Sequence, residues 1–154
     1  MICGFLSKIE LTDQPIERYS PPWDGPFEPC HRQDHHVTRE EFLTRIRAAV
    51  IARDQIPGGS DFVIIGRTDS AQVLGMEEAV TRLKLAADAG ADVCFIEGVK
   101  SKDLLEKTVA ALAPKPVLVN VISGGLTPSF TCKEAEEMGA KIISKCLTVV
   151  SVLY

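Results

Sequence analysis

The sequence predicts an α/β fold, a partial (β/α)8 barrel of about four strand–helix units behind an irregular N-terminal arm. Short apolar runs alternate with segments of helical periodicity, as is typical of parallel strands joined by helices. The expected strand starts at 62, 93, 117 and 141 are 31, 24 and 24 residues apart, which suits right-handed crossovers. No Gly-x-Gly-x-x-Gly turn follows a strand, which favours a barrel over a dinucleotide-binding sheet. Since an eight-stranded barrel takes about 250 residues, four strands make only part of one.

Composition and charge exclude several function classes. The chain has 154 residues, 45% hydrophobic and 25% charged, with a net charge of −4. It is therefore expected to be globular, with no basic surface for nucleic acid. No apolar run approaches the roughly 20 residues of a membrane span, and the first residues lack a signal-peptide pattern. Five cysteines without a Cys-x-x-Cys pair favour reduced thiols, so we expect an intracellular and most simply cytoplasmic protein.

Residues 1–37 are expected to form an irregular, proline-rich arm, and residues 38–154 the barrel domain. Prolines at 15, 21, 22, 26 and 29 restrict the backbone and remove hydrogen-bond donors. The segment also lacks a hydrophobic period. Regular structure is therefore expected to begin at Thr38.

Capping signals mark the starts of three of the four predicted helices. Thr38 and Thr131 precede Glu41 and Glu134 at the capping-box spacing, and Ser101 is expected to cap a further helix. The predicted helices cover residues 38–54, 76–87, 101–112 and 131–138.

Each predicted strand is a short apolar run. The first lies in Asp61–Ser70 and covers residues 62–66, and the others begin with Val93–Ile96, Val117–Val119 and Lys141–Ser144. Continuous apolar runs suit strands that are buried on both faces of the sheet.

Polar side chains end three of the predicted strands. Arg67, Thr68 and Asp69 follow the first, Glu97 the second and Asn120 the third. The tips of parallel strands open on one face of the sheet. There a guanidinium can grip a carboxylate, a glutamate can bind a hydroxyl or manage a proton, and an asparagine can hydrogen-bond a carbonyl. The set suits a small polyoxygenated acid, with Asp69 supporting the Arg67 loop. Alternatively, the strand ends are polar only because loops are exposed to solvent.

Two further groups have a functional and a structural interpretation. Gly124-Gly125 would let backbone amides approach an anion, or would form only a flexible turn. Cys30, His31, His35 and His36 are donor types for a metal, but their spacing matches no standard zinc pattern.

The C-terminal stretch 147–154 is uncharged and rich in residues of high β propensity. It is expected to pair with a partner or to misassemble, because nothing after it in the sequence would cover it. A homo-oligomer is therefore among the expected states.

Several stretches between residues 38 and 146 carry a family likeness. They are Thr38-Arg-Glu-Glu-Phe with Arg45-Ile-Arg-Ala-Ala, Asp61-Phe-Val-Ile-Ile-Gly-Arg-Thr-Asp-Ser, Glu78-Ala-Val-Thr-Arg-Leu, Ala89-Gly-Ala-Asp-Val-Cys-Phe-Ile-Glu-Gly, Val119-Asn120 and Thr127-Pro-Ser. Together they resemble the isocitrate lyase and phosphoenolpyruvate mutase superfamily. Within it, the nearest branch is that of the oxaloacetate hydrolase and carboxyphosphonoenolpyruvate mutase-like proteins.

The resemblance implies a modified (β/α)8 barrel that acts on small 2-oxo or 2-hydroxy dicarboxylic acids. Members hold the substrate on Mg²⁺ and cleave or form a carbon–carbon or carbon–phosphorus bond through an enolate-like intermediate, which the metal stabilises. By this resemblance Arg67 would bind a substrate carboxylate, and Glu97 and Asn120 would hydrogen-bond the substrate.

The chain also departs from the family pattern. Four strands that precede the Thr38 helix in the family are expected to be absent, together with the Asp-rich Mg²⁺ motif and a Glu-Asp pair. The family's catalytic cysteine lies in a Lys-Lys/Arg-Cys-Gly-His motif, of which Cys30-His31 would be a remnant. No metal ligand is therefore assigned in this chain.

Three functions follow from these observations. The first is a Mg²⁺-dependent lyase or hydrolase of the superfamily, acting on C–C or C–P bonds of small acids such as oxaloacetate. The alternative is a truncated, catalytically inactive member that binds or oligomerises. The third, an unrelated nucleotide-binding domain, is disfavoured because no glycine-rich phosphate turn is present.

Overall fold

Five parallel strands form a single sheet in the computed structural model, which describes residues 8–14, 36–57, 61–122 and 125–146. The strands are β1 (Lys8–Thr12), β2 (Val63–Thr68), β3 (Val93–Ile96), β4 (Val117–Ile122) and β5 (Ile142–Cys146), and they pair in chain order. The helices are α1 (Arg39–Gln55), α2 (Met76–Asp88), α3 (Lys102–Leu112) and α4 (Cys132–Glu137), with a short 3₁₀ helix, η2 (Ser70–Gln72), after β2. Within this described part of the chain, no helix has the length and apolarity that a membrane crossing requires.

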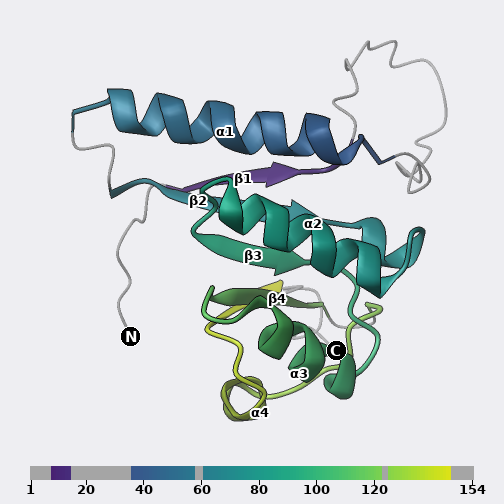
Figure 1. The fold of residues 1–154 in the computed structure, drawn as a ribbon. Helices are drawn as coiled ribbons and strands as arrows, with labels where there is room; N and C mark the ends of the chain where they lie inside the picture. Colours follow the sequence, from purple (N-terminus) through teal and green to yellow (C-terminus); the bar gives the residue numbers. More distant parts are fainter. Residues whose placement is uncertain (1–7, 15–35, 58–60, 123–124, 147–154) are drawn as a thin grey trace, which may run out of the picture.

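The helices cover one face of the sheet (Figure 1). α1 contacts β1 and β2, and α2 contacts β2 and β3. Successive residues of a strand point to opposite faces, and both faces are apolar: Ile64 packs against α1 and α2, whereas Ile65 belongs to a cluster on the other face with Val93, Phe95 and Leu118. The prediction of strands buried on both faces is confirmed for β2 and β3.

The predicted caps stabilise the helix starts. Thr38 Oγ1 accepts a hydrogen bond from the Glu41 amide at 3.2 Å, and Ser101 Oγ accepts one from the Leu104 amide at 3.2 Å. At α4, Thr131 and Glu134 form both halves of the capping box. At α1 the box is only half formed, because the Glu41 carboxylate pairs with Arg45 instead.

The expectation that residues 1–37 are irregular is wrong for Lys8–Thr12, which forms β1. The prolines that argued against regular structure begin only at residue 15. Before them, Ile9 and Leu11 alternate with polar residues, the pattern of a strand. Asp61–Ser70 thus carries the second strand of this sheet, and one strand precedes α1 where none was expected. The domain boundary at residue 37 stays a prediction.

Two strands are longer than predicted. β2 continues to Thr68 and β4 to Ile122, so Arg67 and Asn120 lie within strands and not after them. The neighbouring strands explain the extension, since Thr68 pairs with Ile96 and Ile122 pairs with Cys146 in register.

Glu78 joins α2 to α1 through Arg39 and also pairs with Arg82 of its own helix. Its carboxylate accepts hydrogen bonds from Arg39 of α1 and, at 2.9 Å, from Nε of Arg82 one turn further along α2. The hydrogen bond from Arg39 is the largest cause that lowers the pKa of Glu78, from 4.5 to about 2. The Arg82 side chain is only 6% exposed, so Glu78 also neutralises a buried cation.

We expect Glu78→Gln to lower the free energy of unfolding at pH 7 by about 1–2 kcal/mol, because charge-assisted hydrogen bonds are lost. The folded-state pKa lies below that of the unfolded state, so this stability is present above about pH 4.5 and disappears as the pH falls toward 2. Urea unfolding at pH 7 and pH 3 measures both effects. Glu77→Gln removes an exposed carboxylate from the same first turn of α2. It is therefore the matched control for a lost interaction with the helix dipole. Equal losses in the two variants at pH 7 would refute the ion-pair account.

Candidate functional site

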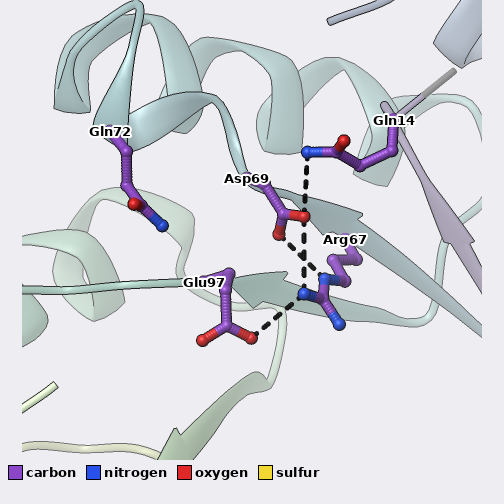
Figure 2. Close-up of a pocket in the computed structure, with 5 residues that line it drawn as sticks. All are labelled: Gln14, Arg67, Asp69, Gln72 and Glu97. Atoms are coloured by element: carbon purple, nitrogen blue, oxygen red, sulfur yellow. Dashed lines mark hydrogen bonds and ion pairs between the residues drawn. The ribbon is translucent and has the colours of Figure 1, made fainter. Parts of the chain in front are cut away.

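The carboxyl ends of β1, β2 and β3 place five polar side chains around one small cavity (Figure 2). Arg67 is the penultimate residue of β2, Asp69 follows that strand, and Glu97 follows β3. Gln14 comes from the segment after β1 and Gln72 from η2. Parallel strands explain the convergence, because their carboxyl ends all lie at the same edge of the sheet.

The guanidinium of Arg67 is the centre of this site. Nε donates to Asp69 Oδ1 at 2.8 Å, Nη1 lies 3.0 Å from Glu10 Oε1, and Nη2 lies 3.2 Å from Glu97 Oε2. The guanidinium also stacks over the Phe95 ring, 4.9 Å from the ring centre. One cation therefore faces three carboxylates, and the local charge is negative.

Burial and the paired carboxylates act in opposite directions on the pKa of Arg67. Burial opposes the charge and is the largest single influence, but hydrogen bonds from Arg67 to Asp69 and Glu10, with the charge of Glu97, outweigh it. The net effect raises the pKa of Arg67 above its ordinary value. Arginine is charged at any ordinary pH, and this shift strengthens that state, so Arg67 is a permanent cation.

The cavity has a volume of about 90 Å³ and is lined by Gln14, Arg67, Asp69, Gln72 and Glu97. Drug-sized ligand pockets are several times larger, at roughly 300–1,000 Å³. All five lining residues carry hydrogen-bonding groups, so the cavity suits a small, highly polar molecule. In Figure 2 the Gln72 carboxamide points toward the space between Asp69 and Glu97.

A glycine after β3 makes room for Gln72. Gly98 has φ +72, and a Cβ placed on it would lie 2.6 Å from Gln72 Nε2. Any side chain here would be strained by the left-handed backbone and would also push Gln72 aside. Gly98 also donates its amide to Glu97 Oε1 at 3.2 Å, which helps to orient that carboxylate.

A buried aspartate lies behind the cavity and holds the strand ends. Asp13 is fully buried. It accepts hydrogen bonds from Thr68 Oγ1 at 2.5 Å and from the Asp69 amide at 3.1 Å. Arg82 Nη1 lies 3.4 Å and His36 Nδ1 3.5 Å from its carboxylate. Asp13 therefore fixes the backbone of Asp69, whose side chain in turn holds Arg67.

The structure brings some of the predicted residues together and leaves others apart. Arg67, Asp69 and Glu97 converge, and the contact between Asp69 and Arg67 is present. Asn120, half-buried in β4 opposite Ser144, does not line the cavity. Cys30 lies outside the described residues, so its assignment as a catalytic remnant stays a prediction.

The other predicted groups give no site in the described part of the chain. His31, His35 and Gly124 fall outside it. His36 is described, but its side chain is buried beside Asp13, only 2% exposed. Within residues 8–14, 36–57, 61–122 and 125–146, no three acidic, histidine or cysteine side chains gather as metal ligands would.

Sequence reasoning missed the contributions of β1 and α2. Glu10, Asp13 and Gln14 lie in the segment that was expected to be irregular, and the alternation over Lys8–Thr12 is the signal that could have revealed them. Arg82 follows Glu78 at the i,i+4 spacing of a helical ion pair, which could have marked it as paired.

Comparison with known proteins identifies the family. Residues 24–154 match the family described as phosphoenolpyruvate phosphomutase. The chain belongs to this family. The expected membership of the phosphoenolpyruvate mutase and isocitrate lyase superfamily is confirmed, and the five-stranded parallel sheet is part of its (β/α)8 barrel.

Two curated relatives are similar over most of this chain. A petal death protein of Dianthus caryophyllus is 40% identical over 114 residues, 74% of this chain and 34% of its own length. A 2-methylisocitrate lyase of Salmonella typhimurium is 41% identical over 98 residues, 64% of this chain and 32% of its own length. The chain thus spans about a third of the length of these relatives.

A solved structure of an oxaloacetate acetylhydrolase in complex with the product oxalate matches with a TM-score of 0.78 and 39% identity, over 93% of this chain and 44% of that one. An oxaloacetate acetylhydrolase in complex with the inhibitor 3,3-difluorooxalacetate matches with a TM-score of 0.71 and 45% identity, over 75% of this chain and 38% of that one.

Proposed function

We propose that the Arg67 site binds a small 2-oxo or 2-hydroxy dicarboxylate such as oxaloacetate, and that the chain serves in cleaving its carbon–carbon bond. The observation that carries this proposal is the cavity itself, which is small, lined by five residues with polar side chains and centred on a permanently charged guanidinium. Relatives named for oxaloacetate and 2-methylisocitrate chemistry support the same class of ligand. A carbon–phosphorus bond is the other bond type that family membership suggests.

Each cavity residue has a role that its chemistry allows. Arg67 would bind a ligand carboxylate through its planar donors. Glu97, aligned by the Gly98 amide, would accept a hydrogen bond from a ligand hydroxyl or hold a proton. Asn120 stays a proposed substrate contact, one that would require the ligand to reach from the Arg67 cavity to β4.

The residues described do not fit the Mg²⁺ ion that the resemblance implies. Glu10, Asp69 and Glu97 are the carboxylates at the strand ends, and each is paired with the Arg67 guanidinium. No group of three potential ligands forms among the described residues. We therefore assign no step to a metal held by these residues.

A second function follows from the same observation. Binding without catalysis, alone or as part of an oligomer, needs Arg67 and its cavity but no metal ligands. The two edge strands, β1 and β5, each pair with one neighbour in the described sheet, and an open strand edge is a common place for chains to associate.

Oxaloacetate turnover tests the proposal. Hydrolysis of the carbon–carbon bond consumes water and yields oxalate and acetate, which can be measured as oxaloacetate disappears, with and without added Mg²⁺. Turnover above the buffer rate supports the lyase or hydrolase function. Binding of oxaloacetate without turnover supports the non-catalytic alternative, and the absence of both overturns the proposed ligand class.

A further inference from the structure

Glu10 forms an ion pair with the Arg67 guanidinium, the group that is proposed above to bind a ligand carboxylate. In the parallel pairing of β1 with β2, Glu10 stands opposite Ile65. Side chains two residues apart share a face of a strand, so Glu10 and Arg67 are diagonal neighbours on the face away from the helices. Glu10 Oε1 lies 3.0 Å from Arg67 Nη1. The register of the sheet thus places a protein carboxylate where a ligand carboxylate would bind.

The three nitrogens of Arg67 are all engaged, so an incoming carboxylate has to replace one of the present partners. Asp69 is the most firmly held, because its amide donates to Asp13 and its Oδ2 accepts from Gln14 Nε2 at 3.1 Å. Its side chain is 16% exposed.

The other two carboxylates differ in how they are held. Glu97 is 19% exposed and accepts a second hydrogen bond from the Gly98 amide. The side chain of Glu10 is 37% exposed, and among the described residues Arg67 is the one hydrogen-bond and ion-pair partner of its carboxylate. Glu10 is therefore the partner that water competes for most and the one that leaves Arg67 most readily.

We infer that Glu10 is a tethered competitor, which occupies Arg67 Nη1 in the empty site and yields it to a ligand carboxylate. The inference rests on the proposed function, since it takes the same site to bind a small dicarboxylate. Glu10 weakens such binding in two ways: its pair with Arg67 has to break, and its charge then repels the anion at close range. It thereby sets the affinity of the site for doubly charged acids.

Calorimetric titration of the full chain with oxalate, at low ionic strength, tests this inference. Glu10→Gln keeps the size of the side chain and removes its charge, and it is expected to tighten oxalate binding about 1.5- to fivefold, the range of an exposed ion pair. Glu10→Ala, which also removes the remaining hydrogen bond, is expected to tighten binding at least as much. The matched control is Glu40→Gln, which removes an exposed α1 carboxylate paired with Arg47 at 3.0 Å.

The outcomes separate this inference from the proposed function. Tighter binding by both Glu10 variants than by Glu40→Gln supports the competitor role. Equal binding by all three variants and the unchanged chain overturns that role and leaves the proposed function in place. If none of them binds oxalate, both the proposed ligand class and the competitor role fail. Thermal unfolding of each variant confirms that the comparison is made on folded protein.

Discussion

Replacing Asp13 by alanine is expected to lower the free energy of unfolding by about 3–5 kcal/mol, the loss seen when one partner of a buried ion pair is removed. Asp13 is fully buried and faces Arg82, whose side chain is 6% exposed. The variant would leave the guanidinium of Arg82 with Glu78 as its remaining carboxylate partner. It would also leave Thr68 Oγ1 and the Asp69 amide without the acceptor they now use.

Since domains are stable by only about 5–15 kcal/mol, this single change removes a large share of the total. Urea unfolding followed by circular dichroism measures it. Asp13→Asn is expected to fall between alanine and the unchanged chain, because the amide keeps one acceptor oxygen but loses the charge. Asp61→Ala, at an exposed position before β2, is the control for a lost aspartate. A loss below about 1 kcal/mol for Asp13→Ala, the level of ordinary surface changes, would show that the buried network does not hold the fold.

Replacing Arg67 by methionine is expected to weaken oxalate binding by about ten- to a hundredfold, which corresponds to the loss of one or two charge-assisted hydrogen bonds. Methionine keeps an unbranched side chain against Phe95 but provides no donor. Arg67→Lys keeps the charge without the planar fork, so an intermediate affinity is expected. Calorimetric titration compares the three proteins, and equal affinities would contradict a role for Arg67 in binding.

The same methionine variant has a distinctive dependence of stability on salt. Without Arg67, three carboxylates, from Glu10, Asp69 and Glu97, face one another with no cation between them. Salt screens their repulsion, so the deficit in unfolding free energy relative to the unchanged chain should be largest at low ionic strength and should shrink as salt is added. A deficit that is constant over this range would show that the carboxylates do not interact.

Local rules predicted the helices and most of the sheet from the sequence. Capping threonines and serines placed the starts of α1, α3 and α4 because the cap depends on side chains within one turn. The strands after α1 were predictable because each buries a continuous apolar run.

Contacts distant in sequence were the ones that sequence reasoning missed. β1 has only five residues, and its place in the sheet depends on pairing with β2 more than fifty residues away. The prolines at 15 and beyond indicate irregular backbone, and that expectation was extended to the residues before them. Without β1 there is no Glu10 beside Arg67 and no Asp13 behind Asp69, so only half of the charge pattern at the site could be predicted.

The site residues divide in the same way. Arg67 and Glu97 were predictable because the ends of consecutive parallel strands meet at one edge. Asn120 was expected beside them by the same rule, yet β4 continues two residues beyond it and the cavity forms between β1, β2 and β3. The length of a strand depends on its register with the neighbouring strand, and that register cannot be read from the local sequence.

The central claim is that a small dicarboxylate binds at Arg67, and its most direct test is a titration of oxalate into the ¹⁵N-labelled chain followed by NMR. We predict that the Arg67 Nε–H signal and the backbone amides of Asp69 and Gly98 shift together and saturate at one oxalate per chain. Signals near a second cavity, lined by Lys84 and Lys115 between the ends of α2 and α3, should stay in place. Shifts confined to that second cavity, with the Arg67 signal unchanged, would contradict the claim.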